Sequence, residues 1–236
     1  MSDDEENDYI PCKVVLLGEA GVGKTSIITR YVSDTFSQYV MTSTGSSFVS
    51  KNIKLDENNK VKLQIWDTAG QEKYRSLAKI FYQSTAVAIL VYDITTRSSF
   101  EGIKNYWAKE IQNNSPSDII IVVVANKSDN YLQQEVPTEE GKDLAKELNA
   151  IFSSTSAKLG NGIDELFKLI AEKFIDPSKD ISESFMSKDE IKDKHKKVKL
   201  EEIRKKSQTE VNKQKKKCCS KWILKMNIKK IYCLYV

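Results

Sequence analysis

The chain has few cysteines, no long apolar run and no apolar leader, and each of these shortages excludes a class of protein. Its four cysteines have the spacing of neither a disulfide framework nor a metal site, so we expect a reducing compartment. The acidic, polar first residues exclude a secretory signal peptide. The longest apolar run before the C-terminal tail, Ile119–Ala125, is far shorter than the roughly 20 residues of a membrane-spanning helix, and its length predicts a buried strand.

Charge is unevenly divided along the 236 residues. Residues 1–180 carry 20 of the 37 lysines and arginines and 26 of the 33 acidic residues, a net charge of −6. Residues 181–236 carry the other 17 basic and 7 acidic residues, a net charge of +10. A basic tail on an acidic domain suits a membrane surface or a nucleic acid better than an active site.

Short apolar segments alternate with amphipathic ones as far as Phe174, without an internal repeat. This order predicts an α/β fold with a six-stranded, mostly parallel sheet covered by helices on both faces. The hairpin signal Asp56-Glu57-Asn58-Asn59 makes the second and third strands antiparallel neighbours. The predicted strands are residues 13–17, 48–55, 61–66, 87–92, 119–126 and 151–154. The predicted helices are residues 26–33, 98–113, 138–148 and 163–174.

Composition divides the chain into three parts. We expect residues 1–9 to be a disordered acidic lead-in, residues 10–177 to form the globular domain, and residues 178–236 to form a basic, flexible tail. Pro177 closes the last helix of the domain. Within the domain, we interpret residues 34–47 as an exposed loop and residues 70–84 as partly helical.

Residues 18–25, Gly-Glu-Ala-Gly-Val-Gly-Lys-Thr, fit the phosphate-binding pattern G-x-x-x-x-G-K-[ST] between a predicted strand and a predicted helix. Glycines let backbone N–H groups and the positive end of the helix point at one phosphate chain. Lys24 would neutralise the β- and γ-phosphates, and the Thr25 hydroxyl would hold Mg²⁺. The alternative is a glycine-rich turn with a chance Lys-Thr. The predicted phosphate-binding residues are Gly18, Ala20, Gly21, Val22, Gly23, Lys24, Thr25 and Ser26.

A second polar motif, Asp67-Thr68-Ala69-Gly70-Gln71, follows the third strand. Asp67 can hold Mg²⁺, usually through water, and Gly70 allows a backbone N–H to approach a γ-phosphate. Gln71 carries both a donor and an acceptor, as the orientation of an attacking water requires. The alternative is an ordinary strand-to-loop aspartate with a turn glycine.

Two further motifs predict a guanine site. Asp129, in Asn126-Lys127-Ser128-Asp129, only accepts hydrogen bonds, and guanine offers it two adjacent N–H donors where adenine presents an acceptor. Lys127 can lie along the base, and Asn126 can tie this segment to the phosphate loop. In Thr155-Ser156-Ala157-Lys158, the N–H of Ala157 can reach the guanine carbonyl oxygen, with Ser156 and Lys158 in support.

In this order the motifs resemble the P-loop small GTPases of the Ras superfamily. Residues 66–77, Trp-Asp-Thr-Ala-Gly-Gln-Glu-Lys-Tyr-Arg-Ser-Leu, resemble the Rab family in particular. The sequence as a whole resembles the endocytic Rabs within that family. The resemblance covers residues 10–175. It implies a switch that binds GTP or GDP with Mg²⁺ and regulates vesicle trafficking on the cytosolic face of an endosomal or vesicle membrane. It also implies an exchange factor, a GTPase-activating protein, a GDP-dissociation inhibitor or escort protein, and effectors.

The resemblance assigns roles to four aromatic residues. Phe36 would pack edge-on against guanine. Phe48, Trp66 and Phe81 would form the aromatic cluster that effectors contact, and ordinary core packing is the alternative for these three.

At two positions in the domain the sequence departs from the Rab pattern. Spacing places Ser43 where Rabs have the Thr that closes over Mg²⁺ and the γ-phosphate, and Ser keeps the hydroxyl but lacks the methyl group. Thr42 or Thr44 can replace it after a shift in register. Lys73 stands where Arg is usual, a smaller change because no bidentate contact is evident there.

The tail contains a cysteine pair, Cys218 and Cys219, which resembles the prenylated end of Rab proteins. Residues 220–236 follow it, and they end in Cys233-Leu234-Tyr235-Val236, with prenylation spacing but an unsuitable third residue. Three alternatives stay open: an unmodified tail, prenylation at Cys233, or a true end at the pair. The basic and apolar residues 221–232 can themselves lie on a membrane.

We therefore predict a GTPase with Gln71 and Lys24 as catalytic residues and slow turnover without an activating protein. The alternative is a nucleotide-binding scaffold with no useful hydrolysis, which Gln71 and the Ser43 hydroxyl disfavour. Nucleic-acid binding would explain the basic tail, but the domain is net negative and has no basic and aromatic surface pattern, so we expect no nucleic-acid partner.

Overall fold

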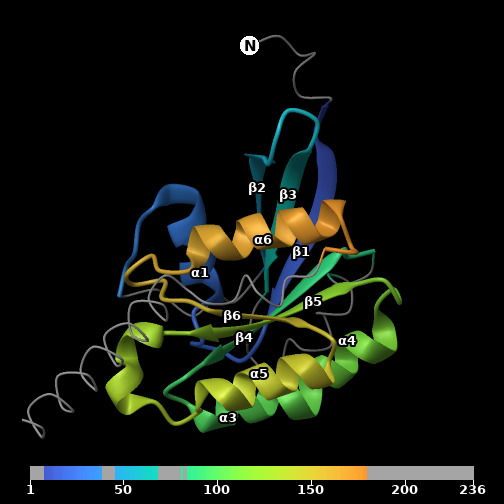
Figure 1. The fold of residues 1–236 in the computed structure, drawn as a ribbon. Coiled ribbons are helices and arrows are strands. Elements are labelled where there is room, and N and C mark those ends of the chain that lie inside the picture. Colours follow the sequence, from blue (N-terminus) through green and yellow to red (C-terminus); the bar gives the residue numbers. More distant parts are fainter. Residues whose placement is uncertain (1–7, 39–45, 69–80, 82–83, 180–236) are drawn as a thin grey trace, which may run out of the picture. The chain divides into compact units, whose positions relative to one another are not determined.

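The computed structural model describes residues 8–38, 46–68, 81 and 84–179, and every structural statement below concerns these residues. The chain divides into two compact units, Met1–Phe185 and Met186–Val236, and all described residues belong to the first. Six strands form one sheet in this unit (Figure 1). They are β1 (Ile10–Leu17), β2 (Ser47–Lys54), β3 (Lys60–Asp67), β4 (Val87–Asp93), β5 (Ile120–Asn126) and β6 (Ile151–Ser154).

The strand order is β2-β3-β1-β4-β5-β6, and β2 and β3 are the only antiparallel pair. The predicted hairpin joins these two strands. Asp56 closes it, because its Oδ1 accepts hydrogen bonds from the backbone N–H groups of Asn58 and Asn59, each at 2.9 Å. The predicted six-stranded, mostly parallel sheet is therefore confirmed.

Helices cover both faces of the sheet, as predicted (Figure 1). On one face, α1 (Lys24–Ser33) and α6 (Ile163–Ile175) pack against the side chains of Val14 and Leu16. On the other face, α3 (Arg97–Gly102), α4 (Ala108–Asn114) and α5 (Thr138–Glu147) pack against Val15 and Leu17. Alternate residues of β1 thus belong to two separate hydrophobic cores, one on each face of the sheet. No described helix is long and apolar enough to cross a membrane.

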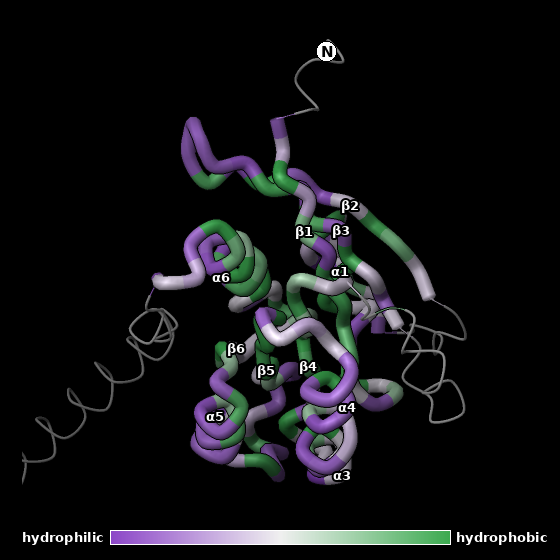
Figure 2. The backbone as a smooth tube through the Cα atoms, turned by 90° about the vertical axis from the view of Figure 1, so that its right-hand side faces the viewer, coloured by the Kyte–Doolittle hydropathy of each residue, from purple (hydrophilic) through white to green (hydrophobic). Residues whose placement is uncertain are grey.

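Burial explains why the strands differ in sequence. Every residue of β4 is buried, since neighbouring strands and helices enclose it on all sides. Strand β2 lies at the edge of the sheet and alternates exposed with half-buried residues. Figure 2 shows the same contrast: β4 and β5 are almost entirely apolar, whereas α3, α5 and α6 carry polar and apolar residues in turn.

The predicted single helix at residues 98–113 is wrong in one detail. The structure has α3, a π-helical turn η3 (Ile103–Trp107) and α4 in succession. The π-turn accommodates an extra residue in the helical ladder, and the hydrophobic spacing does not reveal it. A 3₁₀-helix η4 (Ser128–Gln133) was also not predicted, because a run of polar residues carries no periodicity.

The parallel strands bring the predicted motifs to one edge of the sheet. The loop after β1 leads into α1, Thr68 follows β3, Lys127 follows β5 and Thr155 follows β6. In a parallel sheet the carboxyl ends of the strands share this edge, and ligands bind beyond it.

Candidate functional site

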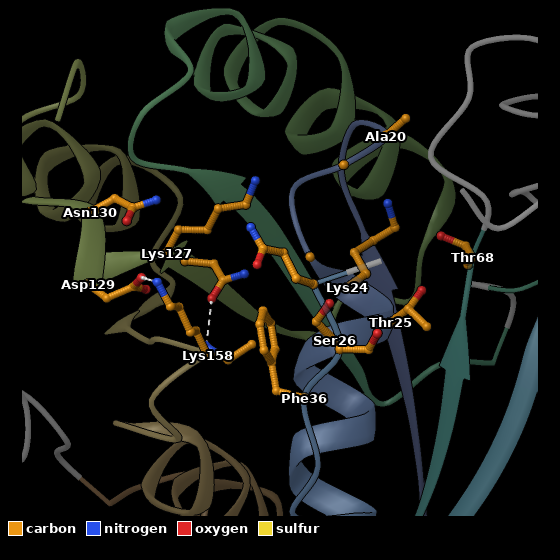
Figure 3. A pocket seen from close by; sticks show the side chains of 16 residues that line it. Ala20, Lys24, Thr25, Ser26, Phe36, Thr68, Lys127, Asp129, Asn130 and Lys158 are labelled. Carbon is orange, nitrogen blue, oxygen red and sulfur yellow. Dashed lines mark hydrogen bonds and ion pairs between the residues drawn. The ribbon is translucent and has the colours of Figure 1, made fainter. Parts of the chain in front are cut away.

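The site is a pocket of about 350 Å³ at the carboxyl edge of the sheet. Figure 3 shows Asp129 and Asn130 at one end and Lys24, Thr25 and Thr68 at the other, with Lys127, Lys158 and Phe36 between them. The structure brings most predicted site residues together around it. Those that line it are Ala20, Gly21, Gly23, Lys24, Thr25, Ser26, Phe36, Asn126, Lys127, Asp129, Ala157 and Lys158.

At two positions of the phosphate loop, the backbone conformation and the neighbouring atoms require glycine. Gly18 has φ +144°, and a Cβ there would lie 2.2 Å from the backbone oxygen of Val91. Gly23 has φ +99°, and its Cβ would lie 2.4 Å from Nδ2 of Asn126. Gly23 is the N-cap of α1 and has no side chain that could accept a hydrogen bond. The first N–H groups of this helix therefore receive no side-chain cap from Gly23, and they face the loop. Such a helix end attracts a phosphate group.

Lys24 lies across its own loop and is buried. Its Nζ donates to the backbone oxygens of Gly18 and Glu19, each at 2.9 Å. Burial lowers the pKa of Lys24 to about 8, against the opposing effects of the Asp67 and Glu19 carboxylates. A phosphate chain in the pocket would supply the negative charge that this buried ammonium group lacks.

Thr25 and Asp67 meet behind the phosphate loop. The Thr25 hydroxyl donates to Oδ2 of Asp67 at 2.6 Å, while Oδ1 of Asp67 is buried without a hydrogen-bond partner among the described residues. Burial raises the pKa of the Asp67 carboxyl, and the Thr25 hydrogen bond and Lys24 oppose this shift. An orphaned carboxylate oxygen beside a hydroxyl fits a hard cation such as Mg²⁺.

The described residues contain no group of three or more histidine, cysteine or acidic side chains that could together hold a metal ion. Mg²⁺ characteristically binds one or two protein oxygens and completes its shell with substrate phosphates and water. The donors at Thr25 and Asp67 therefore fit a magnesium ion that arrives with a nucleotide.

Asn126 joins three segments at the other end of the pocket. Its Nδ2 donates to the backbone oxygen of Val22 at 2.8 Å, which ties β5 to the phosphate loop as predicted. Its Oδ1 accepts hydrogen bonds from the Thr155 hydroxyl at 3.2 Å and from the N–H of Ala157 at 3.4 Å. This one buried amide holds the loops that follow β1, β5 and β6 together.

Asp129 is oriented by a hydroxyl that the sequence assigned only a supporting role. Ser156 donates to Oδ1 of Asp129 at 2.6 Å, and the Nζ of Lys158 lies 3.7 Å from Oδ2 (Figure 3). Lys127 pairs instead with Asp93, with Nζ 2.6 Å from Oδ2. The Asp129 carboxylate is thus a fixed acceptor at the base end of the pocket.

Several predicted residues do not line the pocket, for different reasons. Gly18, Val22, Asp67 and Ser156 lie behind residues that do, and they act through the contacts above. Ser43, Gly70, Gln71, Cys218 and Cys219 lie outside the described residues.

Four lining residues were not predicted. They are Ser37, Gln38, Thr68 and Asn130, each within two positions of a predicted site residue.

The three predicted aromatic residues lie together, with Phe48 on β2, Trp66 on β3 and Phe81 outside the hairpin. The ring centroids of Phe48 and Trp66 are 5.0 Å apart, and those of Trp66 and Phe81 are 5.8 Å apart. Phe48 is 52% exposed, whereas Trp66 and Phe81 pack partly buried against one core. The exposed ring of Phe48 gives the cluster an accessible face.

Comparison with known proteins gives consistent matches. A family model described as "Ras family" matches residues 13–176. GTP-binding protein ypt5 of Schizosaccharomyces pombe is 44% identical over 164 residues, which cover 68% of this chain and 76% of the relative. Ras-related protein RabC of Dictyostelium discoideum is 42% identical over 68% of this chain and 82% of its own length. Human Ras-related protein Rab-22A is 43% identical over 71% of this chain and 84% of its own length.

Proposed function

Because this chain belongs to the Ras family, as one of its Rab small GTPases, we propose that it holds GTP or GDP between Lys24 and Asp129 and hydrolyses GTP with the help of Gln71. As a Rab protein it is a GTP-binding, GTP-hydrolysing molecular switch in vesicle trafficking. The proposal below assigns parts of this activity to residues.

Three groups would bind the phosphates. The backbone N–H groups of the loop and the N-terminus of α1 would surround the β-phosphate, and the Lys24 ammonium group would leave its backbone acceptors for the phosphate oxygens. Thr25, Asp67 and, by sequence, Ser43 would hold Mg²⁺. When bound, Mg²⁺ neutralises charge on the β- and γ-phosphates.

The orientation of the Asp129 carboxylate is the observation that supports guanine specificity. Ser156 fixes one of its oxygens, so the carboxylate faces the pocket as an acceptor for the N1–H and 2-amino groups of guanine. An amide at this position would present one donor and one acceptor, which suits xanthine, because xanthine has a carbonyl in place of the 2-amino group.

We expect Asp129→Asn to weaken GDP binding by about 10²-fold or more and to strengthen XDP binding, because a site with unpaired polar groups rejects the mismatched base. Dissociation rates of fluorescent GDP and XDP from the full chain measure this exchange. Asp118→Asn is the matched control, since Asp118 is exposed in the loop before β5. Unchanged base preference in Asp129→Asn would overturn the assignment.

Hydrolysis is assigned to Gln71, which would orient the attacking water in line with the γ-phosphate. No arginine among the described residues lines the pocket, so none of these supplies a charge to the transition state. We therefore propose unassisted turnover of about 10⁻⁴–10⁻³ per second and acceleration by a separate GTPase-activating protein. The nucleotide-binding scaffold without hydrolysis is not favoured, since the Ras-family members it resembles are GTPases.

The membrane cycle rests on the sequence of the tail. We propose that Cys218 and Cys219 carry prenyl groups, and that the basic tail adds attraction to an anionic cytosolic surface of an endosomal or vesicle membrane. An exchange factor, a GDP-dissociation inhibitor or escort protein, and effectors that contact Phe48, Trp66 and Phe81 would complete the cycle.

A further inference from the structure

Arg30 connects helix α1 to two loops of the base site without lining the pocket. It lies in the last turn of α1, and its side chain is 17% exposed. All three guanidinium nitrogens donate hydrogen bonds. Nε donates to the backbone oxygen of Ala157 at 2.9 Å, Nη2 donates to the backbone oxygen of Lys158 at 2.9 Å, and Nη1 donates to the backbone oxygen of Asp34 at 2.9 Å and to its Oδ1 at 3.0 Å.

Two of these contacts fix the guanine-contacting backbone after β6. Among the described residues, the N–H of Ala157 donates to Oδ1 of Asn126 at 3.4 Å, a weak contact. The peptide group of this N–H is held through the Ser156 carbonyl, which accepts a hydrogen bond from the N–H of Gly160 at 2.7 Å. Arg30 holds the carbonyls of the next two peptide groups, those of residues 157 and 158, so both sets of contacts set the orientation of this N–H. A planar guanidinium presents its donors in a rigid fork and so holds two such carbonyls in a fixed relative orientation, whereas the donors of an ammonium group rotate.

The third contact fixes the start of the loop after α1. Asp34 is the C-cap of this helix and has φ +49°, in the left-handed region. The chain then runs through Phe36, Ser37 and Gln38, all of which line the pocket. Arg30 thus sits between the loop that carries Phe36 and the loop that carries Ala157.

We propose that Arg30 is a positioning residue for guanine recognition, which aims the N–H of Ala157 at the carbonyl oxygen of the base and fixes the origin of the Phe36 loop. The inference rests on the proposed guanine site. It gives Arg30 no part in phosphate or Mg²⁺ binding, because the Arg30 guanidinium makes its hydrogen bonds to residues 34, 157 and 158.

The test compares GDP with 6-thio-GDP on the full chain at neutral pH. The thio-nucleotide keeps both N–H donors for Asp129 but replaces the carbonyl oxygen by sulfur, a much weaker acceptor. The ratio of the two dissociation constants therefore reports the contact of the base with the N–H of Ala157. A general loss of stability would weaken both nucleotides equally and leave this ratio unchanged.

Wild-type protein should prefer GDP to 6-thio-GDP. In Arg30→Ala we expect GDP to dissociate about tenfold faster and the preference over 6-thio-GDP to shrink toward unity, since roughly one hydrogen bond to the base is lost. Arg30→Lys should recover only part of the preference. Arg97→Ala is the matched control, because Arg97 makes ion pairs with Glu101 and Glu140 and does not line the pocket.

Three outcomes separate the claims. An unchanged ratio in Arg30→Ala, with or without weaker binding of both nucleotides, would overturn the inference. Full recovery in Arg30→Lys would contradict the requirement for a planar guanidinium. If wild-type protein bound adenine and guanine nucleotides alike, the proposed function itself would fail, whatever the Arg30 variants did.

Discussion

At the scale of single residues, the buried ammonium group of Lys24 links nucleotide binding to pH. Without nucleotide its pKa is lowered to about 8 by burial. A bound phosphate chain favours the charged form and raises this pKa again. Above pH 8 the empty site holds less than one proton at Lys24 and the filled site holds one, so binding takes up a proton and affinity falls as pH rises.

We therefore predict uptake of roughly half a proton or more per GDP at about pH 8.5, and little at pH 7. Calorimetric titration in two buffers of different ionisation enthalpy measures this number directly. Lys24→Arg should abolish the uptake, because arginine stays protonated. In Lys13→Met the uptake should persist, since Lys13 lies on β1 outside the pocket. Proton uptake that is equal at both pH values would contradict the assignment.

Oδ1 of Asp67, which is buried without a hydrogen-bond partner among the described residues, leads to a prediction for metal removal. Chelation of Mg²⁺ should speed GDP release, and Asp67→Asn should raise the Mg²⁺ concentration needed to slow it by roughly 10–100-fold. GDP dissociation measured over a series of free Mg²⁺ concentrations gives the midpoint for each variant. If the midpoint for Asp67→Asn matched those of wild-type protein and Asp118→Asn, Asp67 would have no role in holding the ion.

The proposed roles of individual residues are of two kinds: those that a sequence motif predicts and those that no motif predicts. Lys24, Asp67 and Asp129 could be predicted because each chemistry demands one residue type at one position after a strand. Arg30 could not, because its partners in the loop after β6 are backbone oxygens more than 120 residues away along the chain. Backbone acceptors belong to every residue, so no sequence pattern marks them.

At the scale of elements, the π-turn η3 connects helices α3 and α4 to the phosphate loop, residues 18–25. Its last residue, Trp107, is fully buried and its Nε1 donates to Oε1 of Glu19 at 3.3 Å. Gly102, at the end of α3, leaves room for this carboxylate, because a Cβ there would lie 2.7 Å from the same oxygen. The wider turn thus accompanies a contact between α3–α4 and the loop that binds phosphate.

Trp107→Phe should lower the free energy of unfolding by about 1–3 kcal/mol, since it removes a donor to a partly buried carboxylate oxygen as well as packing volume. It should also speed GDP release, because Glu19 belongs to the phosphate loop. Chemical denaturation and GDP dissociation measure the two effects. Trp66→Phe, in the exposed aromatic cluster, should leave GDP release unchanged, and equal release rates for both variants would argue against the contact.

The elements themselves were largely predictable, and the exceptions have a common cause. Phe100, Ile103, Trp107 and Ile111 recur at the spacing of an ordinary helix, so the sequence predicted one continuous helix where the structure inserts a π-turn. The 3₁₀-helix η4 follows the turn at Lys127, whose φ of +63° no apolar pattern announces. The hydrophobic periodicity of a sequence shows which face of a helix is buried, but it does not reveal one extra residue in the helical backbone.

At the scale of the whole molecule, charge separates the nucleotide-binding part from the tail. Residues 1–180 are net negative and residues 181–236 carry a net charge of +10 from 17 basic and 7 acidic residues. Basic residues near an anionic membrane contribute on the order of 1 kcal/mol each, and salt screens the attraction.

Removal of residues 180–236 should therefore abolish binding of the unlipidated protein to anionic liposomes and leave GTP hydrolysis unchanged, because every described residue of the site precedes position 180. Co-sedimentation with liposomes at low and high salt measures the first effect, and phosphate release measures the second. Retained, salt-insensitive binding by the shortened chain would place the membrane contact in the globular part.

The most direct test of the account is single-turnover GTP hydrolysis by the full chain with Mg²⁺. Wild-type protein should hydrolyse bound GTP at about 10⁻⁴–10⁻³ per second, and Gln71→Leu should be slower by about tenfold or more while it still binds GTP. Gln112→Leu, on the exposed side of α4, is the matched control and should keep the wild-type rate. Wild-type hydrolysis by Gln71→Leu would contradict the role of Gln71, and failure of the wild-type chain to bind or hydrolyse GTP would contradict the account as a whole.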